Sequence, residues 1–381
     1  MPIYLDHAAT SPMHPAVVDA MIPVMKEAFG NPSSIHSFGR KSRHLVDEAR
    51  LTAAKAIGAK ETEIIFTSGG TEADNLAIIG VARANKHRGN HIITTSIEHH
   101  AVLHTCEQLE KEGFRVTYLP VDETGRISLK DLKDALTENT ILVTIMFGNN
   151  EVGTLQPIQE IGTLLKEHSA YFHTDAVQAF GLVPINVKEL GIDFLSISGH
   201  KINGPKGIGF LYARTGATFH SLTFGGEQER KRRAGTESVP NIVGLQTAIE
   251  LSVEESDFKR ELYKNFKSLM QNIWQEEGID FSINGNEAHS LPHVMNVYFP
   301  GTNVESFLVN MDMAGLSVSS GSACTAGSID PSHVLVAMFG KESDKIASSI
   351  RFSFGLGNDE EQVEKAARET AKIVNRLARK K

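Results

Sequence analysis

Short apolar runs alternate with amphipathic stretches through residues 60–215 of the chain. The runs predict strands, and the stretches between them, such as residues 101–112 and 158–168, predict helices. Strands that alternate with helices are typical of an α/β fold, in which a mostly parallel sheet is covered on both faces. The seven runs that predict strands are residues 64–67, 91–95, 115–120, 141–147, 171–174, 194–198 and 209–213.

The pattern changes near Val253, where a long charged segment begins. We expect a large domain over residues 16–253, and a smaller α+β domain that joins residues 1–15 to residues 254–381. The elements expected in the smaller domain are helices at residues 254–277 and 359–380 and strands at residues 294–299 and 350–354.

The composition of the 381 residues narrows the class of protein. There are 38 basic and 46 acidic side chains, a net charge of −8, which argues against a surface that coats nucleic acid. No apolar stretch approaches the roughly 20 residues that span a bilayer, and the first residues lack the pattern of a signal peptide. Two cysteines are too few for a disulfide framework or a zinc cluster. We therefore expect a cytoplasmic protein without a metal site.

The first segment with candidate chemistry is SGGT at residues 68–71, where a predicted strand runs into a predicted helix. Glycines let the backbone approach an anion closely, and the free N–H groups at a helix start can hold a phosphate. The alternative is an ordinary turn in which Thr71 caps the helix and forms a capping box with Asp74.

Two further segments add a lysine and a carboxylate. Lys201 follows the predicted strand at residues 194–198, where a partly desolvated amine can form a Schiff base. Asp175 follows another strand and can hold a proton on a heterocyclic nitrogen, as pyridoxal chemistry requires. The alternative for Lys201 is an exposed loop lysine, and the alternative for Asp175 is a cap of the next helix. Together, the three segments supply a phosphate cradle at residues 68–71, an aldimine lysine at Lys201 and a pyridinium partner at Asp175.

Motifs along nearly the whole chain resemble those of the NifS/IscS-like cysteine desulfurases, which are fold-type I pyridoxal-phosphate enzymes of aminotransferase class V. The resemblance implies a homodimer that takes L-cysteine and passes its sulfur to an acceptor protein for iron–sulfur cluster assembly or tRNA thiolation. The motifs that carry it are LDHAAT (5–10), GNPSSIHSFGR (30–40), TSGGTEADN (67–75), EHHAV (98–102), NNEVG (149–153), HTDAVQ (173–178), SGHK (198–201), SSGSAC (319–324) and IRFSFG (350–355).

The resemblance also implies a role for each matching residue. Lys201 forms the Schiff base with the cofactor, His99 stacks on the ring and moves protons, and Arg351 binds the substrate carboxylate. The other implied positions bind the cofactor: Gly70, Thr71, Ser198 and His200 at the phosphate, Asp175 at the ring nitrogen, Gln178 at the ring hydroxyl, Asn150 near the same ring edge and the substrate, and Thr236 at the phosphate of the other protomer.

The two cysteines differ in their surroundings. Cys324 lies among small residues in SSGSACTAG at residues 319–327, which leave a thiolate free to attack sulfur and accept it as a persulfide. Cys106 falls on one stripe of a predicted amphipathic helix with Val102 and Leu109, which favours a place in the core.

Several other features have weaker functional interpretations. His100 and His104 have a spacing that can hold a metal, but a surface or core pair is favoured. The run RKRR at residues 230–233 fits an exposed or dimer-interface loop better than a nucleic-acid contact. Glu227 and Leu356 stand where the family often has glycine and arginine, so they bear on the partner surface and on cofactor affinity.

Two other classes of function stay open. An aminotransferase or a selenocysteine lyase of the same fold would keep Lys201 and Asp175, although an aminotransferase does not need the Cys324 segment. A non-catalytic sulfur carrier would keep the fold without the full set of site residues.

Overall fold

The computed structural model describes residues 2–320 and 331–378. Its main feature is a seven-stranded sheet in the order β2-β8-β7-β6-β5-β3-β4. Neighbouring strands run parallel except at β8, which is antiparallel to β2 and β7, so the predicted α/β fold with a mostly parallel sheet is confirmed. The strands are β2 (Ile64–Thr67), β3 (His91–Thr95), β4 (Arg115–Leu119), β5 (Thr140–Thr144), β6 (Tyr171–Asp175), β7 (Phe194–Ser198) and β8 (Gly209–Ala213).

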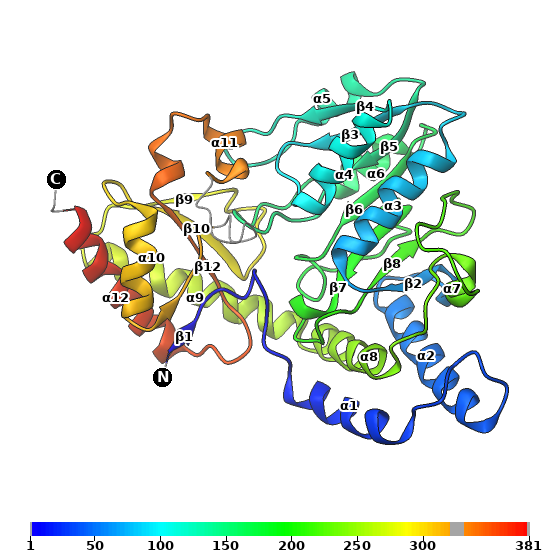
Figure 1. Cartoon of the computed structure of the whole chain (residues 1–381). Coiled ribbons are helices and arrows are strands. Elements are labelled where there is room, and N and C mark those ends of the chain that lie inside the picture. The colour runs from blue at the N-terminus through cyan, green and yellow to red at the C-terminus, as the bar shows by residue number, and fades with distance from the viewer. Residues whose placement is uncertain (1, 321–330, 379–381) are drawn as a thin grey trace.

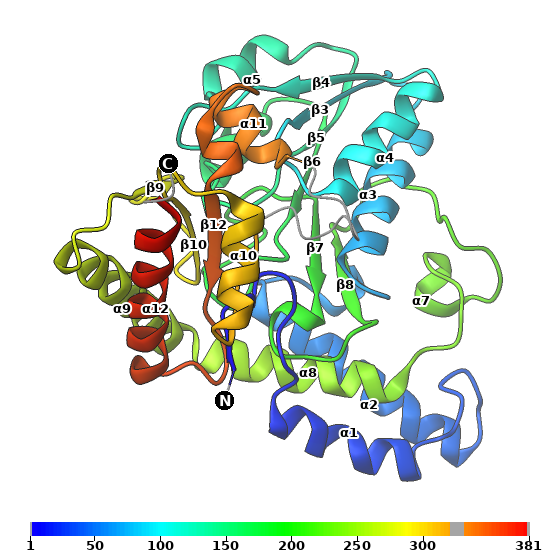
Figure 2. The same cartoon turned by 60° about the vertical axis from the view of Figure 1, so that its left-hand side comes forward.

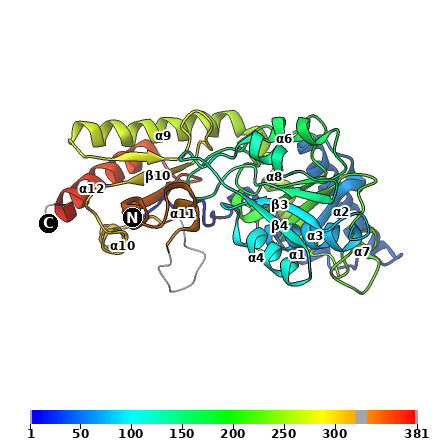
Figure 3. The same cartoon turned by 90° about the horizontal axis from the view of Figure 1, so that it is seen from above.

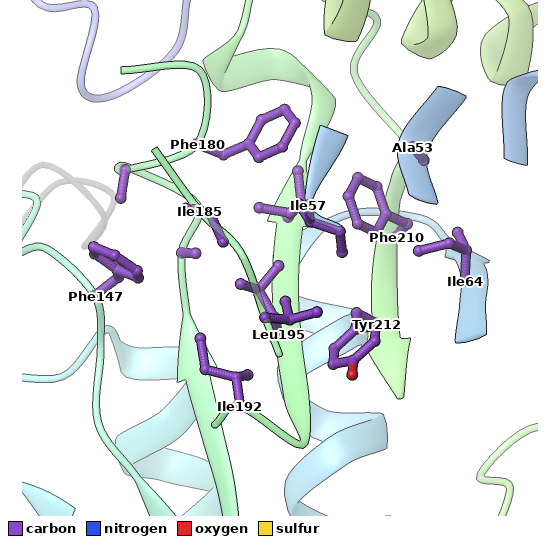
Figure 4. Close-up of a cluster of buried hydrophobic side chains, with 14 of the residues drawn as sticks. Ala53, Ile57, Ile64, Phe147, Phe180, Ile185, Ile192, Leu195, Phe210 and Tyr212 are labelled. Carbon is purple, nitrogen blue, oxygen red and sulfur yellow. The ribbon is translucent and has the colours of Figure 1, made fainter. Parts of the chain in front are cut away.

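The large sheet divides its apolar side chains between two faces, because successive residues of a strand point to opposite sides. On β2, Ile64 and Phe66 enter one hydrophobic core, whereas Ile65 enters the other. Figure 4 shows part of the first core, in which Ile64, Leu195 and Phe210 lie together. Helices α1 (Pro15–Glu27), α2 (Ser37–Ala56), α6 (Ile158–Leu165) and α8 (Val239–Glu254) contribute to the first core, and α3 (Gly70–Ala84) and α4 (His100–Lys111) to the second.

A smaller three-stranded antiparallel sheet lies beside the large one, in the order β12-β10-β9 (Figures 1 and 3). It has its own hydrophobic core, in which the fully buried Trp274 donates a hydrogen bond to the carbonyl oxygen of Ala367 at 3.0 Å. The elements of this part are α9 (Ser256–Glu276), β9 (Ser282–Asn284), β10 (Val294–Tyr298), α10 (Val304–Met313), β11 (Leu316–Ser317), β12 (Ser349–Ser353) and α12 (Glu360–Ala378).

The start of the chain connects the two sheets. Strand β1 (Ile3–Tyr4) pairs with β11, and Ile3 and Leu5 lie in the core of the smaller sheet. We call residues 5–11 the N-terminal strap. At one end its His7 N–H donates to Ser353, and at the other end its Ser11 N–H donates to the carbonyl oxygen of His200 at 3.0 Å. The division into two domains, with a boundary at residue 253, stays a prediction.

Most predicted elements lie where the sequence pattern put them, and four strands of the large sheet have the predicted bounds. The strand predicted at residues 141–147 ends early, at Thr144, because the backbone N–H of Met146 donates to the carboxylate of Glu98 at 3.0 Å. No helix was predicted at α1, α2, α8 or α10, nor at the three shorter helices that follow here. The remaining helices are α5 (Leu129–Ala135), α7 (Gln228–Lys231) and α11 (His333–Phe339).

Within the described ranges, 2–320 and 331–378, none of the helices has both the length and the apolar character that a membrane crossing requires.

Candidate active site

A cavity of about 510 Å³ opens where β2, β3, β5, β6 and β7 end. The carboxyl ends of parallel strands meet at one edge of a sheet, which is the usual ligand position in α/β proteins. Thr236, on the exposed loop between α7 and α8, does not line this cavity, and Cys324 lies outside the described residues. The predicted site residues that do line it are Gly70, Thr71, His99, Asn150, Asp175, Gln178, Ser198, His200, Lys201 and Arg351.

Lys201 ends a short 3₁₀ turn (Gly199–Lys201) that follows β7 directly. Its Nζ atom donates hydrogen bonds to two backbone carbonyl oxygens of the N-terminal strap, Ala8 at 2.5 Å and Ala9 at 2.7 Å. Both alanines line the cavity. The amine therefore reaches the cavity from the large sheet and is held there by a segment from the far end of the chain.

Asp175 is the last residue of β6, and its side chain is buried. Its carboxylate accepts a hydrogen bond from the backbone N–H of Val177 at 2.9 Å. Burial raises the pKa of Asp175 to about 6, although this hydrogen bond and the charge of Lys201 act in the opposite direction. A nearby cation stabilises the ionised form of a buried carboxylate, so Asp175 is suited to pair with a protonated ring nitrogen.

The turn that precedes α3 provides backbone N–H groups at the cavity. The helix begins at Gly70, and its N-cap is Gly69, whose φ of +148° is open to glycine but strained for other residues. A Cβ on Gly70 would lie 2.8 Å from the Cγ2 atom of Val177, so a side chain there would not fit. The alternative in which Thr71 caps the helix is wrong, because the cap position falls on Gly69 and has no side-chain hydrogen bond.

A carboxylate and an arginine fix this turn. Glu72 accepts a hydrogen bond from the backbone N–H of Ser68 at 2.7 Å and forms an ion pair with Arg233 at 2.7 Å. Arg233 belongs to the RKRR run and comes three residues before Thr236. The ion pair compensates the charge of Glu72, which lines the cavity beside a predicted phosphate position.

Two histidines line the cavity as neutral rings. Burial and the nearby charge of Lys201 lower the pKa of His99 and that of His200 to about 4. His99 caps α4, because its Nδ1 atom accepts a hydrogen bond from the N–H of Ala101 at 3.1 Å. The neutral His99 ring consequently carries its proton on Nε2. His200 is held by Thr10 of the strap, whose hydroxyl lies 3.1 Å from Nδ1.

Three residues of the site were missed from the sequence. Asp6, on the strap, forms an ion pair with Arg351 at 2.7 Å. His293 lies behind Gln178, with its Nε2 atom 3.1 Å from the side-chain oxygen of Gln178. Asn149 accepts the N–H groups of Glu151 and Val152 and so shapes the turn that places its neighbour Asn150 at the cavity. The LDHAAT motif contains Asp6, and no comparable signal marked His293.

Cys106 and the residues with weaker functional interpretations do not line the cavity. Cys106 is fully buried in the core between α3, α4 and the sheet, as predicted, and burial raises the pKa of its thiol. His100 and His104 stack with ring centroids 4.9 Å apart, and no cluster that could hold a metal occurs in the described part of the chain. Glu227 is exposed and pairs with Lys231 at 2.9 Å. Neither Glu227 nor Leu356 lines the cavity.

The chain matches the family of aminotransferases of class V over residues 3–366. It is 67% identical over 375 residues to a protein named putative cysteine desulfurase IscS 1 from Bacillus subtilis (strain 168), covering 98% of this chain and 99% of the relative. It is 50% identical over 376 residues to the cysteine desulfurase IscS of Methanosarcina thermophila, covering 98% and 92% of the two chains.

Solved structures agree with this relationship. A NifS-like protein superposes with a TM-score of 0.92 at 36% identity, covering 99% of this chain and all of its own (100%). The DndA protein of Streptomyces lividans gives a TM-score of 0.78 at 36% identity, covering 92% of this chain and 99% of its own.

The cavity fits the cofactor of this family. Lys201 supplies an amine, Asp175 a buried carboxylate, and the turn at Gly69 and Gly70 a backbone cradle in which a Cβ on Gly70 would clash with Val177. These are the groups that the aldehyde, ring nitrogen and phosphate of pyridoxal phosphate need. The chain therefore belongs to the aminotransferase class V family, as a pyridoxal-phosphate-dependent cysteine desulfurase of the NifS/IscS-like type.

Proposed function

We propose that this cavity converts L-cysteine to L-alanine and that Cys324 receives the sulfur as a persulfide. The observation that supports the proposal is the convergence of Lys201, Asp175 and Arg351 on one cavity. An amine, a buried carboxylate and a buried guanidinium are the groups that bind the cofactor aldehyde, the ring nitrogen and the substrate carboxylate.

Each residue has one task in the proposed reaction. Bound pyridoxal phosphate supplies an electron sink for the negative charge that forms at the substrate Cα atom. The Lys201 amine would hold the cofactor aldehyde and would take the proton from the substrate Cα atom. Asp175 keeps a proton on the ring nitrogen, and the neutral His99 exchanges a proton with the substrate thiol through Nε2. Arg351 orients the substrate through its carboxylate.

The remaining residues hold the cofactor without taking part in proton transfer. The phosphate is bound by the backbone N–H groups of Gly70 and Thr71, which lie at the start of a helix, where anions commonly bind. Ser198 and His200 contribute further contacts to the phosphate. Gln178 would bind the ring hydroxyl, and Asn150 would contact the same edge of the ring and the substrate.

The sulfur step is a nucleophilic displacement. The Cys324 thiolate forms a bond to the substrate sulfur, the bond between that sulfur and the substrate carbon breaks, and its electron pair stays on the carbon that becomes the methyl group of alanine. The persulfide then passes its outer sulfur to an acceptor protein, in iron–sulfur cluster assembly or in tRNA thiolation. We place this transfer in the cytoplasm.

The protein acts as a homodimer in this proposal, with Thr236 of each protomer reaching the phosphate site of the other. Two features support it. Thr236 is exposed and lies outside the cavity of its own chain. Large apolar side chains are also exposed along α1 and the connection from α1 to α2, among them Met25, Phe29 and Ile35. In Figure 2 these helices lie at the lower right. Exposed apolar patches of this kind mark protein–protein contacts.

A comparison of the two cysteines tests the proposal. Cys324→Ala should keep the absorbance of the bound cofactor and stop sulfide release from L-cysteine in the presence of a reductant, whereas Cys106→Ala should keep both. Labelled sulfur from cysteine should remain on the unmodified protein after gel filtration and be absent from Cys324→Ala. Sulfide release at the normal rate by Cys324→Ala would contradict the proposal, and release from selenocysteine alone would favour a selenocysteine lyase.

A further inference from the structure

Arg351 is almost completely buried, with 2% of its surface exposed, on the edge strand β12 of the small sheet. Its Nη2 atom donates to the carboxylate of Asp6 at 2.7 Å, and its Nη1 atom donates to the backbone carbonyl of Asn150 at 3.0 Å. Its Nε atom is also buried, and among the described residues it has no hydrogen-bond partner. Arg351 nevertheless lines the cavity.

These contacts fix the orientation of the guanidinium. The group is planar and carries five N–H donors in a rigid fork, so holding both terminal nitrogens sets the direction of the others. One N–H on each terminal nitrogen and the N–H on Nε remain for a ligand. A buried donor without a partner is rare in proteins, and a carboxylate that accepts two parallel N–H groups would satisfy it.

Asp6 is held in place independently of Arg351. It lies on the N-terminal strap, and its backbone forms a bridge with Ser353 of β12, two residues after Arg351. Its carbonyl oxygen accepts hydrogen bonds from the hydroxyl of Tyr4 at 3.0 Å and from the N–H of Ala9 at 3.0 Å. The carboxylate is therefore attached to a fixed backbone, and it can act as a support for the arginine.

We propose that Asp6 is a positioning residue for substrate binding, which orients Arg351 before the carboxylate of L-cysteine arrives. This inference rests on the proposed role of Arg351 as the carboxylate-binding group. Asp6 stabilises the buried charge of Arg351 in the empty site. It also removes the need to order a long side chain during binding, and this second effect favours the substrate complex. Because Asp6 acts only through Arg351, it should affect how tightly carboxylates bind and leave the sulfur chemistry unchanged.

The test uses the holoenzyme with Asp6→Asn, which keeps the shape of the side chain and removes its charge. We expect KM for L-cysteine to rise about tenfold, the equivalent of about 1.4 kcal/mol, while kcat changes less than about twofold. The dissociation constant of L-alanine, followed by the cofactor absorbance, should rise by the same factor. Inhibition by cysteamine, which has the amine and thiol of cysteine but no carboxylate, should stay the same.

A double-mutant cycle separates positioning from a general structural role. In an Arg351→Ala background, Asp6→Asn should add less than about a twofold change in KM, because the residue through which it acts is gone. Equal losses in both backgrounds, a KM for Asp6→Asn within twofold of the parent, or an equal loss toward cysteamine would overturn the proposal. If Asp6→Asn does not fold, Asp6→Glu, which keeps the charge and displaces it, takes its place with the same expected rise in KM.

The same cycle tests the role of Arg351 in substrate binding separately from the role of Asp6 in positioning Arg351. An Arg351→Ala enzyme with an unchanged KM for L-cysteine would refute the proposed role of Arg351 itself. A raised KM in Arg351→Ala together with an unchanged KM in Asp6→Asn would refute only the role of Asp6.

Discussion

The Nζ atom of Lys201 lies 2.7 Å from the backbone carbonyl oxygen of Ala9, although the two residues are 192 positions apart in the sequence. A backbone carbonyl cannot be protonated at neutral pH and cannot be removed by a side-chain change. The strap therefore offers the lysine a fixed acceptor next to the cavity, and the amine has a defined place whenever it is not bonded to the cofactor.

Replacing the lysine should separate cofactor binding from covalent attachment. Lys201→Ala should lower turnover of L-cysteine by about 10³-fold or more, because the amine is both the attachment point and the base. Gel filtration should then remove most of the cofactor and its visible absorbance. Lys111→Ala, at the exposed end of α4, is the matched control and should keep both activity and colour. A coloured, fully active Lys201→Ala protein would contradict the assignment.

The two cysteines should react with iodoacetamide at very different rates. Cys106 is fully buried, and burial raises the pKa of its thiol, so little thiolate is available. We expect alkylation of Cys324 in the native protein and of Cys106 only after unfolding in urea. Peptide mass spectrometry at successive times gives the order, and native labelling of Cys106 at the rate of Cys324 would show that the predicted difference is wrong.

The raised pKa of Asp175 predicts a pH-dependent effect on the stability of the cofactor-free protein. Burial raises this pKa from 3.8 to about 6, so the protonated carboxyl favours the folded state and the ionised one opposes it. This contribution is complete below about pH 4 and is lost as the pH rises through 6. Asp175→Asn should thus be more stable than the parent at pH 7.5, by up to about 3 kcal/mol, and equal to it near pH 4.

Urea unfolding of both cofactor-free proteins at the two pH values measures this difference. A stability difference that does not change with pH would mean that Asp175 does not titrate in this range. In the holoenzyme the same variant should lose most of its turnover, because an amide cannot keep the ring nitrogen protonated.

The loop that carries Thr236 depends on a buried ion pair. Glu229 contacts Arg50 through two hydrogen bonds, at 2.6 and 2.8 Å, and also accepts the N–H of Phe66 at 3.0 Å. Removing one partner of a buried pair leaves an uncompensated charge, so Glu229→Ala should cost about 3–5 kcal/mol of unfolding free energy.

Glu227 provides the control for this variant. Its ion pair with Lys231 is exposed on both sides, and such pairs contribute about 0–1 kcal/mol. Glu227→Ala should consequently unfold at nearly the same denaturant concentration as the parent. Equal effects of the two substitutions would mean that burial does not govern the strength of these pairs.

The apolar patch formed by α1, the start of α2 and the loop between them should be required for dimer formation. Phe29 is 74% exposed and lies 5.2 Å from Phe38, measured between ring centroids. The double variant Phe29→Asp/Phe38→Asp should elute at half the mass of the parent and hold its cofactor less tightly, because Thr236 would no longer reach a partner. Phe258→Asp, an exposed apolar position on α9, is the control. A dimeric double variant would place the interface elsewhere.

Much of the site could be predicted because its residues follow predicted strands. Asp175 and Lys201 come at the carboxyl ends of β6 and β7, and the order of the strands brings them to one cavity. The partners Asp6 and His293 could not be predicted in this way. Their contacts cross between segments that are far apart in the sequence, and no local pattern of apolar residues records such a pairing.

Local structure was also misjudged where a backbone feature outweighed a side-chain preference. Thr71 is a good capping residue, but the chain turns at Gly69, which adopts a φ that threonine avoids. The helix α2 was missed because its buried face consists largely of glycine, serine and alanine, with Arg50 among the buried residues, and therefore lacks a strong apolar stripe.

The N-terminal strap also constrains when the active site can form during synthesis. The side chains of Asp6 and Arg351, which are 345 positions apart, can meet only after the ribosome has released the chain through Arg351. Contacts of such sequence separation form slowly and late. The N-terminal strap must therefore wait for strand β12, so a nascent chain should not retain the cofactor until β12 has emerged.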